Sequence, residues 1–354
     1  MNQQYKKYIN QVYLNHVFCH NKKSDLNSNL LNTNFYYYGY GRNALYFALK
    51  NAKVNEDDFV LLPSFICRDL LSAINSIGAR PIYYDVDESL SPLQNLNTMP
   101  KCKVVIAVNY FGFPQNLIPF KEYCLKNESI LIEDNAHGFL SRDLDGKLLG
   151  TRADLGIFSF RKTIFIEYGS GLFIKNIKNL NLDEYIIQPV KKVSFSFYTK
   201  LIIKKIFPLI KISGIRFLTK IIRHIRKIRT GHDFPQSQLD AESILPKKYA
   251  PPFGLKKNIE KIDFKYESKR RRDLYNWLNN KIIDFGGIPV FKELPEKCVP
   301  YGFPFYTPDA LIEEIENQLL LMGLESFSWP DLPDQINNSA PKFYHSLRCV
   351  RFLW

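Results

Sequence analysis

The sequence contains no uncharged apolar run of the ~18 residues that a membrane-spanning helix needs. Its longest candidate, Leu201 to Leu218, carries Lys and Arg side chains along its length. The first residues of the chain are polar and lack the apolar core of a secretory signal. We therefore expect a cytoplasmic protein.

Cysteine is scarce as well, with six in 354 residues, and none of them forms a CxxC pair. No histidine lies at zinc-like spacing from two cysteines, so we expect no metal site. Unreactive thiols in a reducing compartment are the simplest interpretation. The composition, 45% hydrophobic and 23% charged, is typical of a globular chain with one large and one smaller domain.

Acidic residues are absent from one segment. Between Lys191 and His232 the chain has twelve Lys or Arg and no Asp or Glu, whereas the rest has 36 basic and 35 acidic residues. In the second half of this segment Ile and Leu recur at helical spacing opposite Arg and Lys. This pattern indicates a basic amphipathic helix.

Three interpretations of this helix stay open. It could be a solvated insertion that packs on the domain, or it could lie on an anionic membrane through residues 195–230. A nucleic-acid contact is the least favoured, because aromatic residues are few there and no nucleic-acid motif accompanies it. We therefore expect no nucleic-acid partner, and a possible peripheral contact with the inner face of a membrane.

Between residues 36 and 175, short apolar runs alternate with helix-like stretches. The candidate strands are 59–63, 81–86, 104–108, 130–134, 155–160 and 171–174. The amphipathic stretches between the early ones are 42–50, 68–77 and 116–126. This alternation predicts an α/β fold, a three-layer sandwich with a mostly parallel sheet covered on both faces.

The chain as a whole divides into four predicted parts. We expect an N-terminal segment (1–35), a large domain (36–190), the basic helical insertion (191–250) and a small C-terminal α+β domain (251–354). In the last part, helix-like stretches at 259–282 and 309–322 flank the strand or edge pieces PVFKELPE and GFPFY. Ligands of parallel sheets collect at the carboxyl ends of the strands, which directs attention to the ends of the large domain's strands.

The chemistry-bearing residues stand at these strand ends. Asp134 closes one strand, and Ser159 and Lys162 follow the next in a Ser-x-x-Lys order before a glycine-rich turn at 169–171. A lysine amine can form a Schiff base with a carbonyl group, and a carboxylate can keep a pyridine nitrogen protonated. Each residue alone would be an ordinary loop or capping residue, but their order indicates pyridoxal phosphate (PLP) chemistry.

A place for the phosphate group precedes them in the chain. Gly39-Tyr-Gly-Arg-Asn43 opens the first helix of the alternating region. Glycines let the backbone approach an anion, and helix N-termini bind phosphate. An ordinary helix entry would have the same pattern, so this signal gains weight only from its position.

Taken in order, these pieces resemble a known family. The segments GRNALYFAL, VLLPSFICRDLLSAINSIGARPIYYDVD, VVIAVNYFGFP, ILIEDNAHGF, DLGIFSFRK and YGSGLFI are similar to the DegT/DnrJ-type PLP-dependent sugar aminotransferases. These enzymes have the aspartate aminotransferase (type I) fold. The resemblance runs from about Tyr37 to Ile174 and more loosely beyond, and family members usually continue past the position of RFLW, which leaves the completeness of the small domain open.

The resemblance implies a role for each matching residue. Lys162 would form the Schiff base and move a proton, and Asp134 would pair with the pyridine nitrogen. His137 would lie near the phenolic oxygen of the cofactor, and Ser159 near its phosphate. The same phosphate would also be bound by the backbone at Gly41, Arg42 and Asn43.

Two departures from the family pattern concern this site. The lysine follows the serine by three residues, where many members have five. Cys67 stands where the family often has an aromatic residue over the cofactor face. Phe65 or Tyr110 would then be the candidates for stacking on the cofactor.

The implied reaction moves an amino group from an amino acid, with glutamate as the expected donor, to a keto-sugar linked to a nucleotide. Such an enzyme would serve surface polysaccharide biosynthesis, and family members are homodimers. Two alternatives stay open. One is a catalytically silent relative that acts as a membrane-associated scaffold, and the other is a PLP enzyme with another reaction outcome.

Overall fold

The computed structural model of the chain describes residues 34–164, 166–176, 186–189, 221, 225, 228–229, 238, 240–247, 249–260, 262–322 and 324–352. The N-terminal segment predicted for 1–35 and the basic helix predicted within 191–250, with its membrane contact, lie largely outside the described residues. Within the described part of the chain, every helix is too short or too polar to cross a bilayer.

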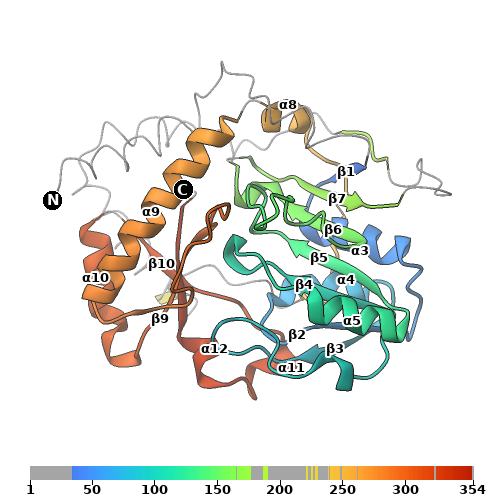
Figure 1. Ribbon diagram of the computed structural model, residues 1–354, viewed down its shortest axis with the longest axis horizontal. Helices are drawn as coiled ribbons and strands as arrows, with labels where there is room; N and C mark the ends of the chain where they lie inside the picture. Colours follow the sequence, from blue (N-terminus) through green and yellow to red (C-terminus); the bar gives the residue numbers. More distant parts are fainter. Residues whose placement is uncertain are drawn as a thin grey trace.

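A seven-stranded sheet forms the larger part of the molecule (Figure 1). Its strands are β1 (Phe35–Tyr38), β2 (Phe59–Pro63), β3 (Arg80–Tyr84), β4 (Val104–Val108), β5 (Ile130–Asn135), β6 (Leu155–Ser159) and β7 (Ser170–Ile174). Their order is β1-β7-β6-β5-β4-β2-β3. Every neighbouring pair from β3 to β6 is parallel, whereas β7 runs antiparallel to both β6 and β1. The predicted α/β class with a mostly parallel sheet is thereby confirmed.

Helices pack on this sheet and bury its strands. They are α3 (Gly41–Asn51), α4 (Leu71–Asn75) and α5 (Ile118–Asn127), with short 3-10 turns η1 (Arg68–Leu70), η2 (Leu96–Thr98), η3 (Tyr110–Gly112) and η4 (Phe160–Lys162). Helix α3 contacts β6 and β7, and α5 contacts β4 and β5. All residues of β4 and β6 are buried, as expected for strands of a sheet that is covered on both faces.

A second, smaller sheet lies beside the first, on the left in Figure 1. It consists of β8 (Ile288–Pro289), β9 (Gly302–Tyr306), β10 (Ser326–Ser328) and β11 (Leu347–Arg351), all antiparallel in the order β10-β11-β9-β8. The accompanying helices are α8 (Leu255–Glu260), α9 (Phe264–Asp284), η7 (Asp309–Leu311), α10 (Ile312–Leu321), α11 (Asp334–Asn337) and α12 (Lys342–Ser346). The exact limits of the four predicted parts stay a prediction.

Two expectations about this second part need correction. The stretch expected to be one helix over 259–282 is divided into α8 and α9, because the Asp263 side chain accepts a hydrogen bond from the Tyr266 N–H and caps a new helix there. The piece PVFKELPE contributes only Pro289 to a strand. Its prolines lack the N–H group that a longer ladder needs.

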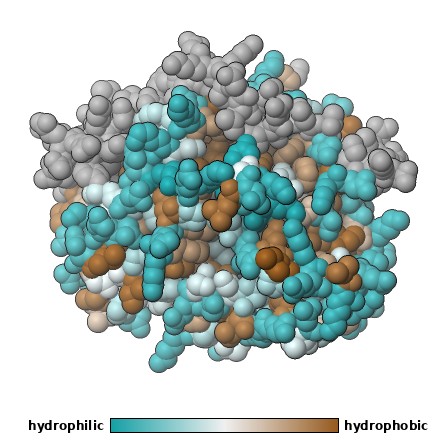
Figure 2. Space-filling view, in the orientation of Figure 1, coloured by the Kyte–Doolittle hydropathy of each residue, from teal (hydrophilic) through white to brown (hydrophobic). Residues whose placement is uncertain are grey.

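The surface seen in the same orientation is mostly hydrophilic, with apolar residues interspersed among charged ones (Figure 2).

The buried side of helix α9 contains charged residues. It carries an ion cluster in which Glu267 accepts hydrogen bonds from Arg270 and Arg271, with both nearest N···O distances at 2.6 Å. The Arg271 guanidinium also donates to the carbonyl oxygens of Thr163 (3.0 Å) and Pro300 (3.2 Å). One buried side chain therefore links α9 to the segment after Lys162 and to the segment before β9.

We expect Arg271→Leu to lower the free energy of unfolding by about 3–5 kcal/mol, because it breaks a buried ion pair and leaves two carbonyl groups without donors. The matched control in the same helix is Lys269→Ala. Its exposed pair with Asp273 should contribute only about 0.3–0.5 kcal/mol. Denaturant unfolding of both variants measures the difference, and equal losses would contradict a special role for Arg271.

Candidate active site

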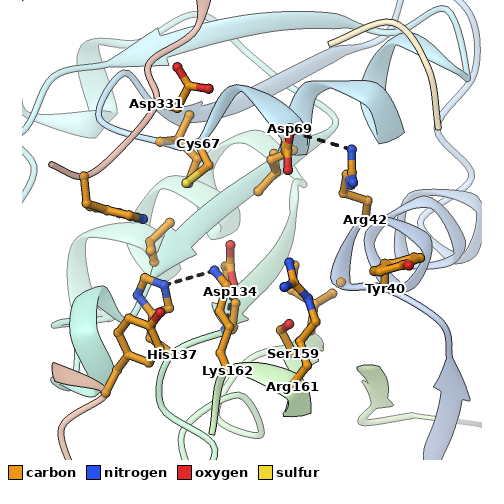
Figure 3. A pocket seen from close by; sticks show the side chains of 18 of the residues that line it. Tyr40, Arg42, Cys67, Asp69, Asp134, His137, Ser159, Arg161, Lys162 and Asp331 are labelled. Carbon is orange, nitrogen blue, oxygen red and sulfur yellow. Dashed lines mark hydrogen bonds and ion pairs between the residues drawn. The ribbon is translucent and has the colours of Figure 1, made fainter. Parts of the chain in front are cut away.

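A cavity of ≈ 380 Å³ lies at the carboxyl ends of the parallel strands (Figure 3). Strands β4, β5 and β6 supply one wall through Val108, Asp134 and Ser159. The opposite wall comes from the second part of the chain, including Trp329 and Arg351. The volume falls in the range of about 300–1,000 Å³ that is typical of small-molecule sites. The position is where open parallel sheets bind ligands.

Lys162 reaches into this cavity from the end of η4. Its Nζ atom lies 3.0 Å from Nε2 of His137, which Figure 3 shows as a dashed line. Burial lowers the pKa of Lys162, and Arg161 adds to this effect, while Cys67 and Asp134 oppose it. The pKa of His137 is also lowered, first by burial and then by the neighbouring cations Lys162 and Arg351. Both shifts increase the share of the neutral form of the side chain.

Asp134 lies near the end of β5, buried beneath Lys162 in the cavity wall. One of its oxygens, Oδ1, accepts a hydrogen bond of 2.9 Å from the N–H of Ala136. Burial raises the pKa of this carboxyl group, and the Ala136 N–H and the Lys162 charge offset part of the increase. A cation that entered the cavity beside Asp134 would favour its ionised form.

The third feature of the cavity is the N-terminus of helix α3 beside the end of strand β6. Ser159 closes β6, and Gly41 and Arg42 begin α3, so that a strand end and a helix N-terminus meet at the same side of the cavity. They are close together, because a Cβ atom on Gly41 would lie 3.7 Å from that of Ser159. The first N–H groups of a helix have no partner within the helix, which makes this end suited to a phosphate group.

Asn43, which the resemblance assigns to phosphate binding, does not line the cavity. Its backbone N–H is 2.9 Å from the carbonyl oxygen of Tyr40, and its side chain bridges the Tyr40 N–H and the Pro246 carbonyl group. The residue stabilises the start of α3. It acts on the cavity only by holding the helix N-terminus in place.

The two aromatic candidates are likewise not part of the cavity lining. Phe65 is fully buried and packs against Tyr344 with ring centroids 4.6 Å apart. Tyr110 donates its hydroxyl hydrogen to the Phe65 carbonyl oxygen at 2.8 Å. Both belong to the core behind the wall, so neither ring faces the ligand space.

Other aromatic residues line the cavity, and the sequence did not reveal them. Tyr301 stacks on His137 with centroids 4.4 Å apart and planes 5° from parallel, and Trp329 meets the same imidazole edge-on at 5.3 Å. Both residues lie more than 130 positions beyond Lys162 in the sequence. No local pattern brings them to the site, because only the packing of the second sheet on the first places them there.

Cys67 lines the cavity, at the position where the family often has an aromatic residue. Asp69 also lines the cavity and pairs with Arg42 at 3.7 Å. In the described part of the chain, no group of three or more His, Cys, Asp or Glu residues is arranged to hold a metal ion. The cavity thus offers an amine, a carboxyl group and a helix N-terminus, a set suited to an organic ligand that carries a carbonyl and a phosphate group.

The thiol of Cys67 should resist alkylation at neutral pH, since burial raises its pKa to about 11. A raised pKa keeps the thiol protonated, and only the thiolate attacks. The rate of iodoacetamide labelling at Cys67, followed by mass spectrometry, should keep rising up to about pH 11. A plateau near the ordinary value of 9.0, measured beside a free thiol in the same solution, would contradict this expectation.

Comparison with known proteins places this arrangement in context. Residues 39–182 match the sequence model of the DegT/DnrJ/EryC1/StrS aminotransferase family. The chain is similar to a dTDP-3-amino-3,4,6-trideoxy-alpha-D-glucose transaminase of Micromonospora megalomicea subsp. nigra, with 33% identity over 136 residues. It is similar to a GDP-perosamine synthase of Escherichia coli O157:H7, with 33% identity over 147 residues. The matches cover 37% and 40% of this chain and only 36% and 40% of those proteins.

Solved structures agree over nearly the whole length. A DegT DnrJ EryC1 StrS aminotransferase from Brucella abortus gives a TM-score of 0.62 at 15% identity, covering 99% of this chain and 91% of that one. The putative sugar aminotransferase Spr1654 of Streptococcus pneumoniae, in its PLP form, gives 0.61 at 13% identity, with 97% and 91% covered. At such identities the likeness establishes the type I fold alone. The sequence match adds the family resemblance: residues 39–182, which carry Asp134 and Lys162, match the model of the DegT/DnrJ/EryC1/StrS aminotransferase family.

Proposed function

We propose that this chain is a PLP-dependent aminotransferase that moves an amino group from an amino acid, glutamate, to a keto-sugar linked to a nucleotide. The observation that carries the proposal is the pair formed by Lys162 and the buried Asp134 in one cavity, within the segment that matches the family. The names of the two relatives, one a dTDP-sugar transaminase and the other a GDP-perosamine synthase, support a nucleotide-linked sugar as the acceptor.

The residues present fit pyridoxal phosphate. Lys162 would hold it through its amine, and Asp134 would face the pyridine nitrogen. Ser159 and the backbone at Gly41 and Arg42 would take the phosphate group at the N-terminus of α3. When bound, the cofactor supplies a ring that accepts electrons from the substrate carbon.

The chain's own residues supply the proton chemistry. The lowered pKa of Lys162 favours an amine with a free lone pair, which can take a proton from a substrate carbon and return it to a neighbouring atom. The ionised form of Asp134, which a cationic ring nitrogen would favour, would stabilise that positive charge. Tyr301 and Trp329 line the cavity and pack against His137, the hydrogen-bond partner of Lys162.

The remaining parts of the proposal rest on the family resemblance. We infer a homodimer, a cytoplasmic location and a role in surface polysaccharide biosynthesis. A peripheral contact with an anionic membrane through residues 195–230 stays a prediction, since those residues lie largely outside the described part of the chain. Liposome co-sedimentation of the full chain against a variant without this segment would test the contact.

Lys162→Ala should abolish the covalent link between protein and cofactor. With added PLP, the wild type is expected to show a yellow absorbance band that borohydride removes, leaving the cofactor fixed on Lys162 as a secondary amine. The variant should show neither the band nor the label. The labelled peptide is identified by mass spectrometry, with the exposed Lys147→Ala as a control that should behave as wild type.

The same experiment separates the alternatives. No band in the wild type would support the silent relative. Asp134→Ala should keep the label on Lys162 but slow glutamate-dependent amination of keto-sugars by several orders of magnitude, because the ring loses its partner carboxylate. Formation of a product other than an amino sugar would indicate another PLP reaction.

Light scattering should give the mass of two chains of 41.4 kDa each. The physical reason is that family active sites lie at the subunit interface and use residues of both chains. Measurement at protein concentrations used for the activity assay is required, because dimers dissociate on dilution. A monomer with full activity would refute the dimer without affecting the assignment of Lys162.

A further inference from the structure

The imidazole of His137 packs against three aromatic rings. Tyr301 stacks on it with centroids 4.4 Å apart, and Phe111 lies 5.6 Å away with its plane 27° from parallel. Trp329 meets the ring edge-on at 5.3 Å. A ring so enclosed cannot turn over freely, so the groups that face its two nitrogen atoms decide which of them carries the proton.

The first of these groups is the backbone N–H of Phe111, which donates to Nδ1 at 3.3 Å. Phe111 adopts φ 53° and ψ 16°, a left-handed conformation that is unfavourable for a residue with a side chain. In this turn the Phe111 N–H points toward the imidazole ring. An acceptor nitrogen needs its lone pair, so in a neutral imidazole the proton must be on Nε2.

The second group is Lys162, whose Nζ lies 3.0 Å from Nε2. An ammonium group has only donors, and two donors cannot share this contact. An amine that has lost its proton can accept. We propose that His137, fixed by the Phe111 N–H as the Nε2-protonated tautomer, donates to Lys162 and thereby keeps this lysine in its unprotonated form.

The charged groups around the pair are consistent with this assignment. Burial disfavours the protonated form of Lys162 and Arg161 adds to this effect, whereas Asp134 and Asp69 favour the protonated form. Around His137, both Lys162 and Arg351 disfavour a cationic ring. Tyr301 itself stays neutral, since burial raises its pKa. The acidic neighbours thus favour the ammonium form of Lys162, and the donated hydrogen bond counteracts them.

The consequence concerns reactivity rather than fold. Only an unprotonated amine has the lone pair needed to attack a carbonyl carbon or to accept a proton. His137 is in this sense a positioning residue for the proton of Lys162, in addition to the contact with a cofactor oxygen that the resemblance implies. The inference depends on the chain alone and holds whether or not the chain transfers amino groups to sugars.

Competitive acetylation tests it without cofactor or sugar. The full-length chain, dialysed with hydroxylamine to remove bound carbonyl compounds, is labelled with trace acetic anhydride across a pH series. Mass spectrometry then compares Lys162 with the exposed Lys147 in the same sample. Lys162 should reach half-maximal labelling at a lower pH than Lys147.

Two substitutions separate the hydrogen bond from burial. His137→Asn keeps an acceptor for the Phe111 N–H and removes the donor to Lys162, and His137→Phe keeps a stacked ring and removes both. In both variants, labelling of Lys162 at neutral pH should fall about tenfold, the effect of losing one hydrogen bond to the amine. His345→Phe, a change at an exposed histidine, should leave it unchanged.

Unchanged labelling of Lys162 in both His137 variants would overturn the proposal, because burial alone would then set its protonation. A second measurement on the wild type does not depend on how the variants fold. The nitrogen-15 chemical shifts of the His137 ring should identify a neutral imidazole with its proton on Nε2. A proton on Nδ1 would refute the assignment directly.

Discussion

A single buried guanidinium, that of Arg271, connects the parts of the chain that form the cavity. Its charge is neutralised by Glu267 on the same helix, and its remaining donors bind the carbonyl groups of Thr163 and Pro300. The residue before Thr163 is Lys162, and the residue after Pro300 is Tyr301, which stacks on His137. Arg271 thus links the segments that carry Lys162 and Tyr301 without lining the cavity itself.

The parallel sheet positions the residues of the other wall of the cavity. Because neighbouring parallel strands end at the same edge, Asp134 and Ser159 come together without any contact between their own side chains being required. The helix that begins at Gly41 adds its N-terminus at that edge. Backbone geometry thus places the carboxyl group and the anion site, and only the amine needs tertiary support from α9.

Much of this could be read from the sequence, and the reasons are local. Strands β2 and β4 were predicted at their observed limits, since apolar runs between turn residues give strong signals. Asp134, Ser159 and Lys162 were found because each lies at the carboxyl end of a strand or just after it. Phe65 shows the limit of such reasoning: an aromatic residue after a strand has the same pattern whether it faces the cavity or, as here, the core.

What escaped prediction depends on packing between distant segments. Tyr301 and Trp329 reach the cavity only because the second sheet is docked on the first. The left-handed conformation of Phe111 was not predicted either, because the neighbouring Gly112 is the residue that a sequence would assign to it. Strand β1 was missed as well, since it is a four-residue edge strand whose pairing with β7 spans more than 130 residues of the sequence.

The strand order of the second sheet has a consequence for the way the protein is made. Strand β11 is synthesised after every other described strand, yet it lies between β9 and β10 and pairs with both. Chains grow from the N-terminus, so the large sheet and its lysine can fold on the ribosome while β9 and β10 still lack the strand that joins them. The wall of the cavity that contains Asp134, Ser159 and Lys162 can therefore form before the second wall, to which Arg351 of β11 belongs, is complete.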